Sequence, residues 1–233
     1  MTPLVVVATP FYDHSVRVQY NAAQWALMGS PHAEMLGTEE ERTTIYQSHD
    51  VCLGRARCVR DFLRLGRGTH LLFWDSDVCG DVGAAVRGML AEGVGCIGAT
   101  YPKKHIRPDG DVDFCLSTAG QSLAVQGNRA ALPPMGFVGA GFLLLSRPLL
   151  ERMSTHYFDA LFFEDEDDST TVDLFAKIRE RDHGGRMRSR PEDFSFCRRV
   201  ALMGETVWLY TGAAMDHVGM HVFRGDRAGL AGG

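Results

Sequence analysis

His70-Leu71-Leu72-Phe73-Trp74-Asp75-Ser76-Asp77 is the stretch of this 233-residue chain that decides its fold. The run from Leu71 to Trp74 is uniformly apolar, and it is too short for a surface helix, so it predicts a central strand of an α/β sheet. Asp75 and Asp77 follow at the carboxyl end of that strand. Because open α/β sheets bind ligands outside this edge, the two carboxylates are predicted to lie where chemistry takes place.

Strand and helix signals alternate on both sides of this stretch. Apolar, β-branched runs predict strands over residues 4–9, 43–47, 94–100, 141–146 and 206–210. Amphipathic or capped segments predict helices over residues 16–28, 53–65, 81–92, 148–155 and 192–203. Residues 101–139 interrupt the rhythm with proline, glycine and charge. We find no internal repeat and no linker, so the pattern predicts a single domain over residues 1–233.

Composition excludes several classes of protein. A chain with 45% hydrophobic and 23% charged residues can bury a sizeable core, and no stretch approaches the roughly 20 apolar residues of a membrane span. Residues 1–9 lack the features of a signal peptide, so a cytoplasmic location is expected. The six cysteines form no CxxC pair and predict reduced thiols. A net charge of −5 disfavours broad adhesion to nucleic acid but leaves a local basic stripe open.

The Asp-x-Asp triplet has two interpretations. On a pleated strand, Asp75 and Asp77 would point to the same side, where both could face one divalent cation directly or through water. Mg²⁺ and Mn²⁺ prefer such oxygen ligands. In the alternative interpretation, the two carboxylates only cap the loop that follows.

Several further segments favour the metal-binding interpretation, because together they resemble GT-A-fold glycosyltransferases in content and order. They are Arg57 in a helix, Thr69–Val78, Tyr101-Pro102-Lys103-Lys104, Gly139-Ala140-Gly141-Phe142, Glu192–Arg199 and His217-Val218-Gly219. The resemblance implies a GT-A (nucleotide-diphospho-sugar transferase) fold, with a single Rossmann-like mixed sheet flanked by helices. It also implies a donor-nucleotide-binding half over residues 1–100 and an acceptor-binding half over residues 101–233.

The activity that the resemblance implies is metal-dependent transfer of a sugar from a nucleotide-diphosphate sugar to an acceptor hydroxyl. The residues leave uridine, guanosine and cytidine sugar nucleotides open as donors, and UDP-glucose is the guess that the resemblance suggests. The implied donor contacts are Thr9, Pro10, Tyr12, Asp50, Arg57, Asp75, Ser76, Lys103, Gly139 and Gly141. Alternatives stay open for some of them: Asp50 as a helix cap, Arg57 as a surface arginine, and Thr9 with Pro10 as a capped strand end.

The resemblance also implies a metal centre and a base. Asp75, Asp77 and His217 would surround Mn²⁺ or Mg²⁺, with His221 as the rival of His217. Asp193 resembles the base of inverting GT-A enzymes, with Glu192 as a second candidate. The alternative for this pair is a favourable interaction with the positive end of a helix dipole.

The acceptor is less determined. Three classes are open: a saccharide or lipid-linked glycan, a hydroxymethylated pyrimidine in phage-type DNA, and a protein side chain. The arginine-rich segment 179–190, read as a glycine-broken loop or a mobile lid, favours an anionic acceptor such as DNA. Two alternatives to a glycosyltransferase are a nucleotidyltransferase and a non-catalytic sugar-nucleotide-binding module. A nucleotidyltransferase should have a glycine-rich phosphate loop after its first strand, and this chain lacks one there.

Overall fold

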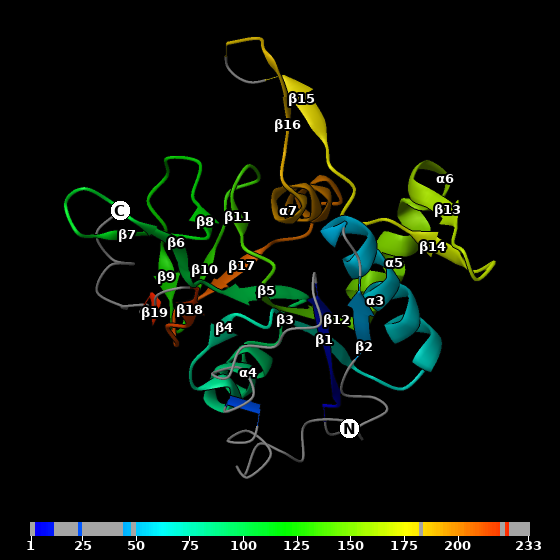
Figure 1. Cartoon of the computed structure of the whole chain (residues 1–233), viewed down its shortest axis with the longest axis horizontal. Helices are drawn as coiled ribbons and strands as arrows, with labels where there is room; N and C mark the ends of the chain where they lie inside the picture. Colours follow the sequence, from blue (N-terminus) through cyan, green and yellow to red (C-terminus); the bar gives the residue numbers. More distant parts are fainter. Residues whose placement is uncertain are drawn as a thin grey trace.

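The computed structural model describes residues 3–11, 23–24, 44–47, 50–181, 184–219 and 222–223. Its centre is an eight-stranded mixed sheet with helices on both faces (Figure 1). The strands, in spatial order, are β2 (Thr44–Gln47), β1 (Val5–Phe11), β3 (His70–Trp74), β12 (Phe142–Ser146), β5 (Cys96–Ala99), β17 (Trp208–Tyr210), β10 (Arg129–Ala131) and β9 (Val125–Gln126). The predicted mixed α/β architecture is therefore confirmed.

The helices divide between the two faces of the sheet. Three of them, α3 (Val51–Leu65), α5 (Arg147–His156) and α7 (Glu192–Leu202), pack on the face that carries Leu71 and Phe73. Helix α4 (Val82–Ala91) packs on the opposite face, which carries Leu72 and Trp74. All four of these strand residues are at most 1% exposed. A continuous apolar run such as β3 thus fits a strand that is covered on both sides.

Helix starts follow the capping signals in the sequence. The side chains of Asp50, Asp81 and Ser146 each accept a hydrogen bond from a backbone amide in the first turn of α3, α4 and α5. Asp50 therefore acts as a helix cap in this structure, which is one of the two roles that the sequence left open. The predicted helix over residues 16–28 lies outside the described residues, apart from Ala23 and Gln24, which are helical.

Strand directions bring several carboxyl ends to one edge of the sheet. β1 and β3 run parallel, β12 runs antiparallel to both β3 and β5, and β17 runs parallel to β5. The carboxyl ends of β1, β3, β5 and β17 therefore lie at the same edge, beside the start of β12. That edge carries the Asp75–Asp77 triplet, Tyr101 and Gly141.

Smaller elements surround this edge and the rim of the molecule. They are β4 (Val78–Cys79) with β18 (Asp216–Val218) and β19 (Val222–Phe223), β6 (Pro102–Ile106) with β7 (Val112–Phe114), β8 (Leu116–Ser117) with β11 (Phe137–Val138), β13 (Phe162–Glu164) with β14 (Thr170–Val172), β15 (Arg179–Arg181) with β16 (Met187–Ser189), and the short helix α6 (Phe158–Leu161).

Two expectations about local structure are corrected here. The arginine-rich segment 179–190 is a β-hairpin rather than a plain loop, because β15 and β16 pair in antiparallel register. His217 lies in strand β18 rather than in a loop, because Asp216 and His217 pair with Cys79 and Val78 of β4. In the part of the chain that is described, no helix is long and apolar enough to cross a bilayer.

Candidate functional site

The Asp75-Ser76-Asp77 triplet forms a tight turn. The amide of Val78 donates to the carbonyl of Asp75 at 3.0 Å, and the indole Nε1 of Trp74 donates to the carbonyl of Val78 at 2.8 Å. The expectation that the two carboxylates share one side of a pleat is therefore wrong, because strand β3 ends at Trp74 and the chain turns. As a result, Asp75 and Asp77 meet different partners.

Asp75 is paired with a buried arginine. Arg55, which is 2% exposed, donates from Nη2 to Asp75 Oδ2 at 2.9 Å and from Nη1 to the carbonyl of Ala140 at 3.2 Å. Burial alone would lower the pKa of Arg55, but Asp75 outweighs this effect and raises it, so the guanidinium stays charged. Two buried atoms of the pair, Arg55 Nε and Asp75 Oδ1, have no hydrogen-bond partner among the described residues.

The glycines of the Gly139-Ala140-Gly141 segment make room for the protein's own side chains. A Cβ on Gly139 would lie 2.6 Å from the hydroxyl of Tyr101, and one on Gly141 would lie 2.5 Å from that hydroxyl and 3.0 Å from Asp75 Oδ2. Tyr101 is buried and accepts a hydrogen bond from the amide of Gly141 at 2.9 Å. In this structure the space that these glycines leave is filled by Tyr101.

Asp77 lies between a histidine and a lysine. Its Oδ1 is 3.4 Å from Nε2 of His217, and its Oδ2 accepts a hydrogen bond from Nζ of Lys104. The backbone also ties the two segments together, since the amide of Val218 donates to the carbonyl of Asp77 at 2.7 Å. Burial opposes ionisation of Asp77, but the hydrogen bonds from His217 and Lys104 outweigh it and lower its pKa to about 2.

The orientation of His217 suits a metal ligand. Its Nδ1 lies 2.7 Å from the carbonyl of Pro102, so Nδ1 carries a proton and Nε2 is the atom directed at Asp77. A cation between Nε2 and the Asp77 carboxylate would be held by both groups.

The donor set fits a cation only in part. Among the described residues, no group of three or more His, Cys, Asp or Glu side chains is arranged to hold a metal by itself. Mg²⁺, however, is commonly held by one or two carboxylates together with substrate phosphates. Asp77 and His217 fit an open site of that kind. Asp75 Oδ1, which has no partner among the described residues, belongs to the same turn.

Asp193 lies in the first turn of α7. It accepts a hydrogen bond from the amide of Phe194 at 2.7 Å. Burial, with a further contribution from the neighbouring Glu192, raises its pKa to about 6. Such a carboxylate is ionised at neutral pH and is more basic than an ordinary aspartate, which suits a general base.

Electrostatic effects connect α7 with the Asp77 side of the site. Burial raises the pKa of the Cys115 thiol to about 12, and both Asp193 and Asp77 add to this shift while Lys103 opposes it. Arg55 likewise lowers the pKa of Asp193 against the effect of burial. The two predicted carboxylates and Lys103 therefore act on one half-buried thiol.

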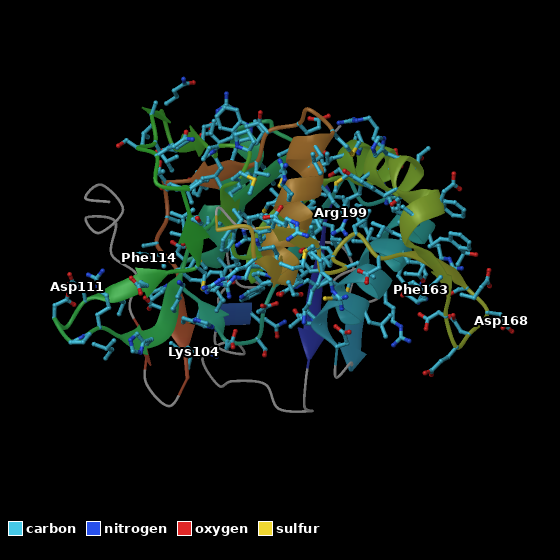
Figure 2. The ribbon with its side chains drawn as sticks, turned by 90° about the horizontal axis from the view of Figure 1, so that it is seen from above. Lys104, Asp111, Phe114, Phe163, Asp168 and Arg199 are labelled. Carbon is cyan, nitrogen blue, oxygen red and sulfur yellow. The ribbon has the colours of Figure 1, made fainter. Side chains whose placement is uncertain are left out.

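Arg57 belongs to a different part of the surface. Its Nε donates to Asp165 Oδ2 at 2.6 Å, and Arg60 donates to the same oxygen at 2.9 Å. Phe163 of β13 and Asp168 of the loop after it lie on the right of Figure 2, whereas Lys104 lies on the left. The structure thus does not bring Arg57 to the Asp75–Asp77 turn. Asp165 belongs to an acidic loop, residues 164–168, and its paired side chain is 6% exposed.

The other predicted donor contacts lie at or near the carboxyl edge. Thr9 is fully buried in β1, and Pro10 is half-buried at the end of that strand. Ser76 is half-buried in the turn, and Lys103 is exposed on β6. Tyr12 and His221 lie outside the described residues.

Three residues of this site were not predicted: Arg55, Tyr101 as a site residue, and Lys104. A signal for Arg55 was present, because it lies within the apolar stripe of α3, between Cys52 and Val59. A charged residue in such a stripe must find a partner in the interior. Lys104 gave no comparable signal, since its pairing with Asp77 depends on how β6 lies against the turn.

Comparisons with known proteins give a structural relative and no sequence relative. No protein-family model matches the chain, and no curated protein matches it in sequence. Among solved structures, the crystal structure of A197 from STIV is similar, with a TM-score of 0.55 and 14% identity over 96% of this chain and 94% of that chain. At this identity the likeness concerns the fold alone. It extends over almost the whole length of both chains.

Proposed function

We propose that this chain is a metal-dependent glycosyltransferase of the GT-A fold, which transfers a sugar from a nucleotide-diphosphate sugar to an acceptor hydroxyl. The contact between Asp77 and His217 carries the proposal. These residues are far apart in sequence, and they meet at the carboxyl edge of an α/β sheet, with Nε2 of His217 directed at the carboxylate. That edge is where such sheets bind their ligands.

Asp77 and His217, helped by Oδ1 of Asp75, would hold Mn²⁺ or Mg²⁺ together with the donor diphosphate. When bound, the cation supplies electrostatic stabilisation of the nucleoside-diphosphate leaving group. Arg55 pairs with Asp75 and fixes its orientation. Lys104 would leave Asp77 for a phosphate oxygen when the donor binds, since an exposed lysine can reorient at little cost.

Asp193 is the proposed base. The acceptor oxygen forms a bond to the anomeric carbon as the bond from that carbon to the diphosphate oxygen breaks, and the proton of the acceptor hydroxyl passes to the Asp193 carboxylate. This displacement inverts the anomeric centre. The raised pKa of Asp193 supports this role. The acceptor hydroxyl belongs to a hydroxymethylated pyrimidine in DNA or to a glycan.

A thermal-shift panel tests the proposal. UDP-, GDP-, TDP- and CMP-sugars are added with and without Mn²⁺ to the wild type, Asp77→Asn and His217→Gln. A ligand that binds only the folded state raises the melting temperature. We expect one nucleotide sugar to do so in a metal-dependent way that both variants lose. Asp159→Asn, an exposed aspartate on α6, is the matched control and should respond like the wild type.

Product analysis separates the alternatives. A glycosyltransferase releases the nucleoside diphosphate, a nucleotidyltransferase releases or consumes pyrophosphate, and a non-catalytic module binds the donor without turnover. If no sugar nucleotide shifts the melting temperature at any metal concentration, the proposal fails.

A further inference from the structure

The β15–β16 hairpin is a basic segment of an acidic chain. Residues 179–190 contain five arginines and two acidic residues, whereas the whole chain has a net charge of −5. In Figure 1 the hairpin projects from the body of the molecule above α7, apart from the acidic loop between β13 and β14. The hairpin is thus a protruding element with a net positive charge.

Arginines occupy both faces of the ribbon. Arg179 and Arg181 lie opposite Ser189 and Met187, and they share one face because alternate residues of a strand point the same way. Arg188, opposite Glu180, lies on the other face. Arg179, Arg181 and Arg188 are exposed, and the Met187 side chain is 58% exposed.

The base of the hairpin is fixed to the proposed catalytic helix. The Arg190 guanidinium lies over the ring of Phe194 at 5.0 Å, and its Nε is 2.8 Å from Glu180 Oε1. The amide of Arg190 also donates to the carbonyl of Ile178 at 2.9 Å. Phe194 is the residue after Asp193, so the base of the hairpin lies beside the first turn of α7, which carries Asp193.

We propose that the β15–β16 hairpin is an acceptor arm that binds the phosphate backbone of DNA. A two-stranded ribbon fits the major groove of B-DNA, which is about 12 Å wide, and arginine pairs bidentately with phosphate oxygens. The description of this arm as part of an acceptor site rests on the proposed transferase activity. The binding of DNA by the arm is independent of that activity and can be measured by itself.

The test compares two triple variants with the same change in charge. Arg179→Gln/Arg181→Gln/Arg188→Gln neutralises the arm, and Arg64→Gln/Arg87→Gln/Arg152→Gln neutralises exposed arginines on α3, α4 and α5. Binding to a short labelled DNA duplex with hydroxymethylcytosine is followed by fluorescence anisotropy between about 50 and 200 mM salt. The melting shift caused by the donor and Mn²⁺ is measured on the same proteins.

We expect the arm variant to bind the duplex at least tenfold more weakly at low salt, with a shallower salt dependence by about one unit per lost phosphate contact. The control variant should bind like the wild type, and both should keep the donor-dependent shift. Equal binding by arm variant and wild type overturns the proposal. The proposal is also overturned if the arm binds a sulfated polysaccharide but does not bind DNA. If DNA binding depends on the arm while no donor shifts the melting temperature, the arm is a DNA-binding element and the transferase proposal fails.

Discussion

Asp193 is destabilising for the folded chain at neutral pH. Its pKa is about 6 in the folded state, against an ordinary value of 3.8. The folded state therefore binds the proton more tightly than the unfolded state does. Stability is highest when Asp193 is protonated, below about pH 4, and it falls as the pH rises through 6. An ionisable group that lowers the stability of the folded state at neutral pH is typical of a functional site.

Asp193→Asn removes this disadvantage. We expect the variant to raise the free energy of unfolding by roughly 1–3 kcal/mol at pH 7.5 and to leave it almost unchanged at pH 4. Urea denaturation at the two pH values measures this, with Asp159→Asn as the exposed control. An equal effect at both pH values would show that Asp193 does not titrate between them.

The same substitution should impair transfer. Once donor and acceptor are identified, we expect Asp193→Asn to lower kcat by about 10²- to 10⁴-fold and to leave the donor-dependent melting shift intact. In the wild type, kcat/KM should fall tenfold per pH unit below about pH 6, because the base becomes protonated. If the variant keeps the wild-type kcat, Asp193 is not the base. Glu192→Gln, one residue earlier, tests the second candidate.

Helix α3 presents two arginines to two different surroundings. Arg55 points into the core and pairs with Asp75, whereas Arg57 points to the loop that carries Asp165. The resemblance to GT-A enzymes selected Arg57 as a donor contact, and the structure gives the position beside the turn to Arg55. The two residues can therefore be separated by their effects on stability and on donor binding.

Arg55→Gln leaves the carboxylate of Asp75 without its charged partner, and such losses cost about 3–5 kcal/mol when the pair is buried. We expect Arg55→Gln to lower both stability and donor affinity. Arg57→Gln should lower stability by a smaller amount, about 1–2 kcal/mol, and leave donor affinity unchanged. Chemical denaturation and donor titration measure the two effects. A loss of donor affinity in Arg57→Gln would restore Arg57 as a donor contact.

The sequence-based predictions were correct where structure depends on residues close together in the sequence, and they were incomplete where it depends on distant residues. Strands such as β3 and helix starts such as Asp50 depend on neighbouring residues, and these were predicted within a few positions. The end of β3 at Trp74 was also predicted correctly. The expectation that Asp75 and Asp77 share one side of a pleat was wrong, because the hydrogen bonds of the Val78 amide and the Trp74 indole close a turn that no local pattern signals. The partners of Asp77 could not be derived from local patterns, since they come from β6 and β18.

At the scale of the whole molecule, the site is completed by the last part of the chain. β18 pairs with β4 directly after the Asp75–Asp77 turn, and this pairing brings His217 to Asp77. All strands of the eight-stranded sheet end before residue 211, and the buried Met215 completes the core on the α4 face. Folding of the sheet and completion of the proposed metal site are thus expected to be separable.

A chain that ends after Met215 tests this separation. We expect it to remain folded, with helix and strand content close to that of the full chain by circular dichroism and a cooperative melting transition. It should lose the metal-dependent part of the donor response, because His217 is absent. Full-length His217→Gln is the matched comparison and should show the same loss with a smaller change in melting temperature. If the shortened chain keeps a full metal-dependent response, the ligand of the cation opposite Asp77 lies elsewhere, and the contact between Asp77 and His217 serves only to fasten β18 to the sheet.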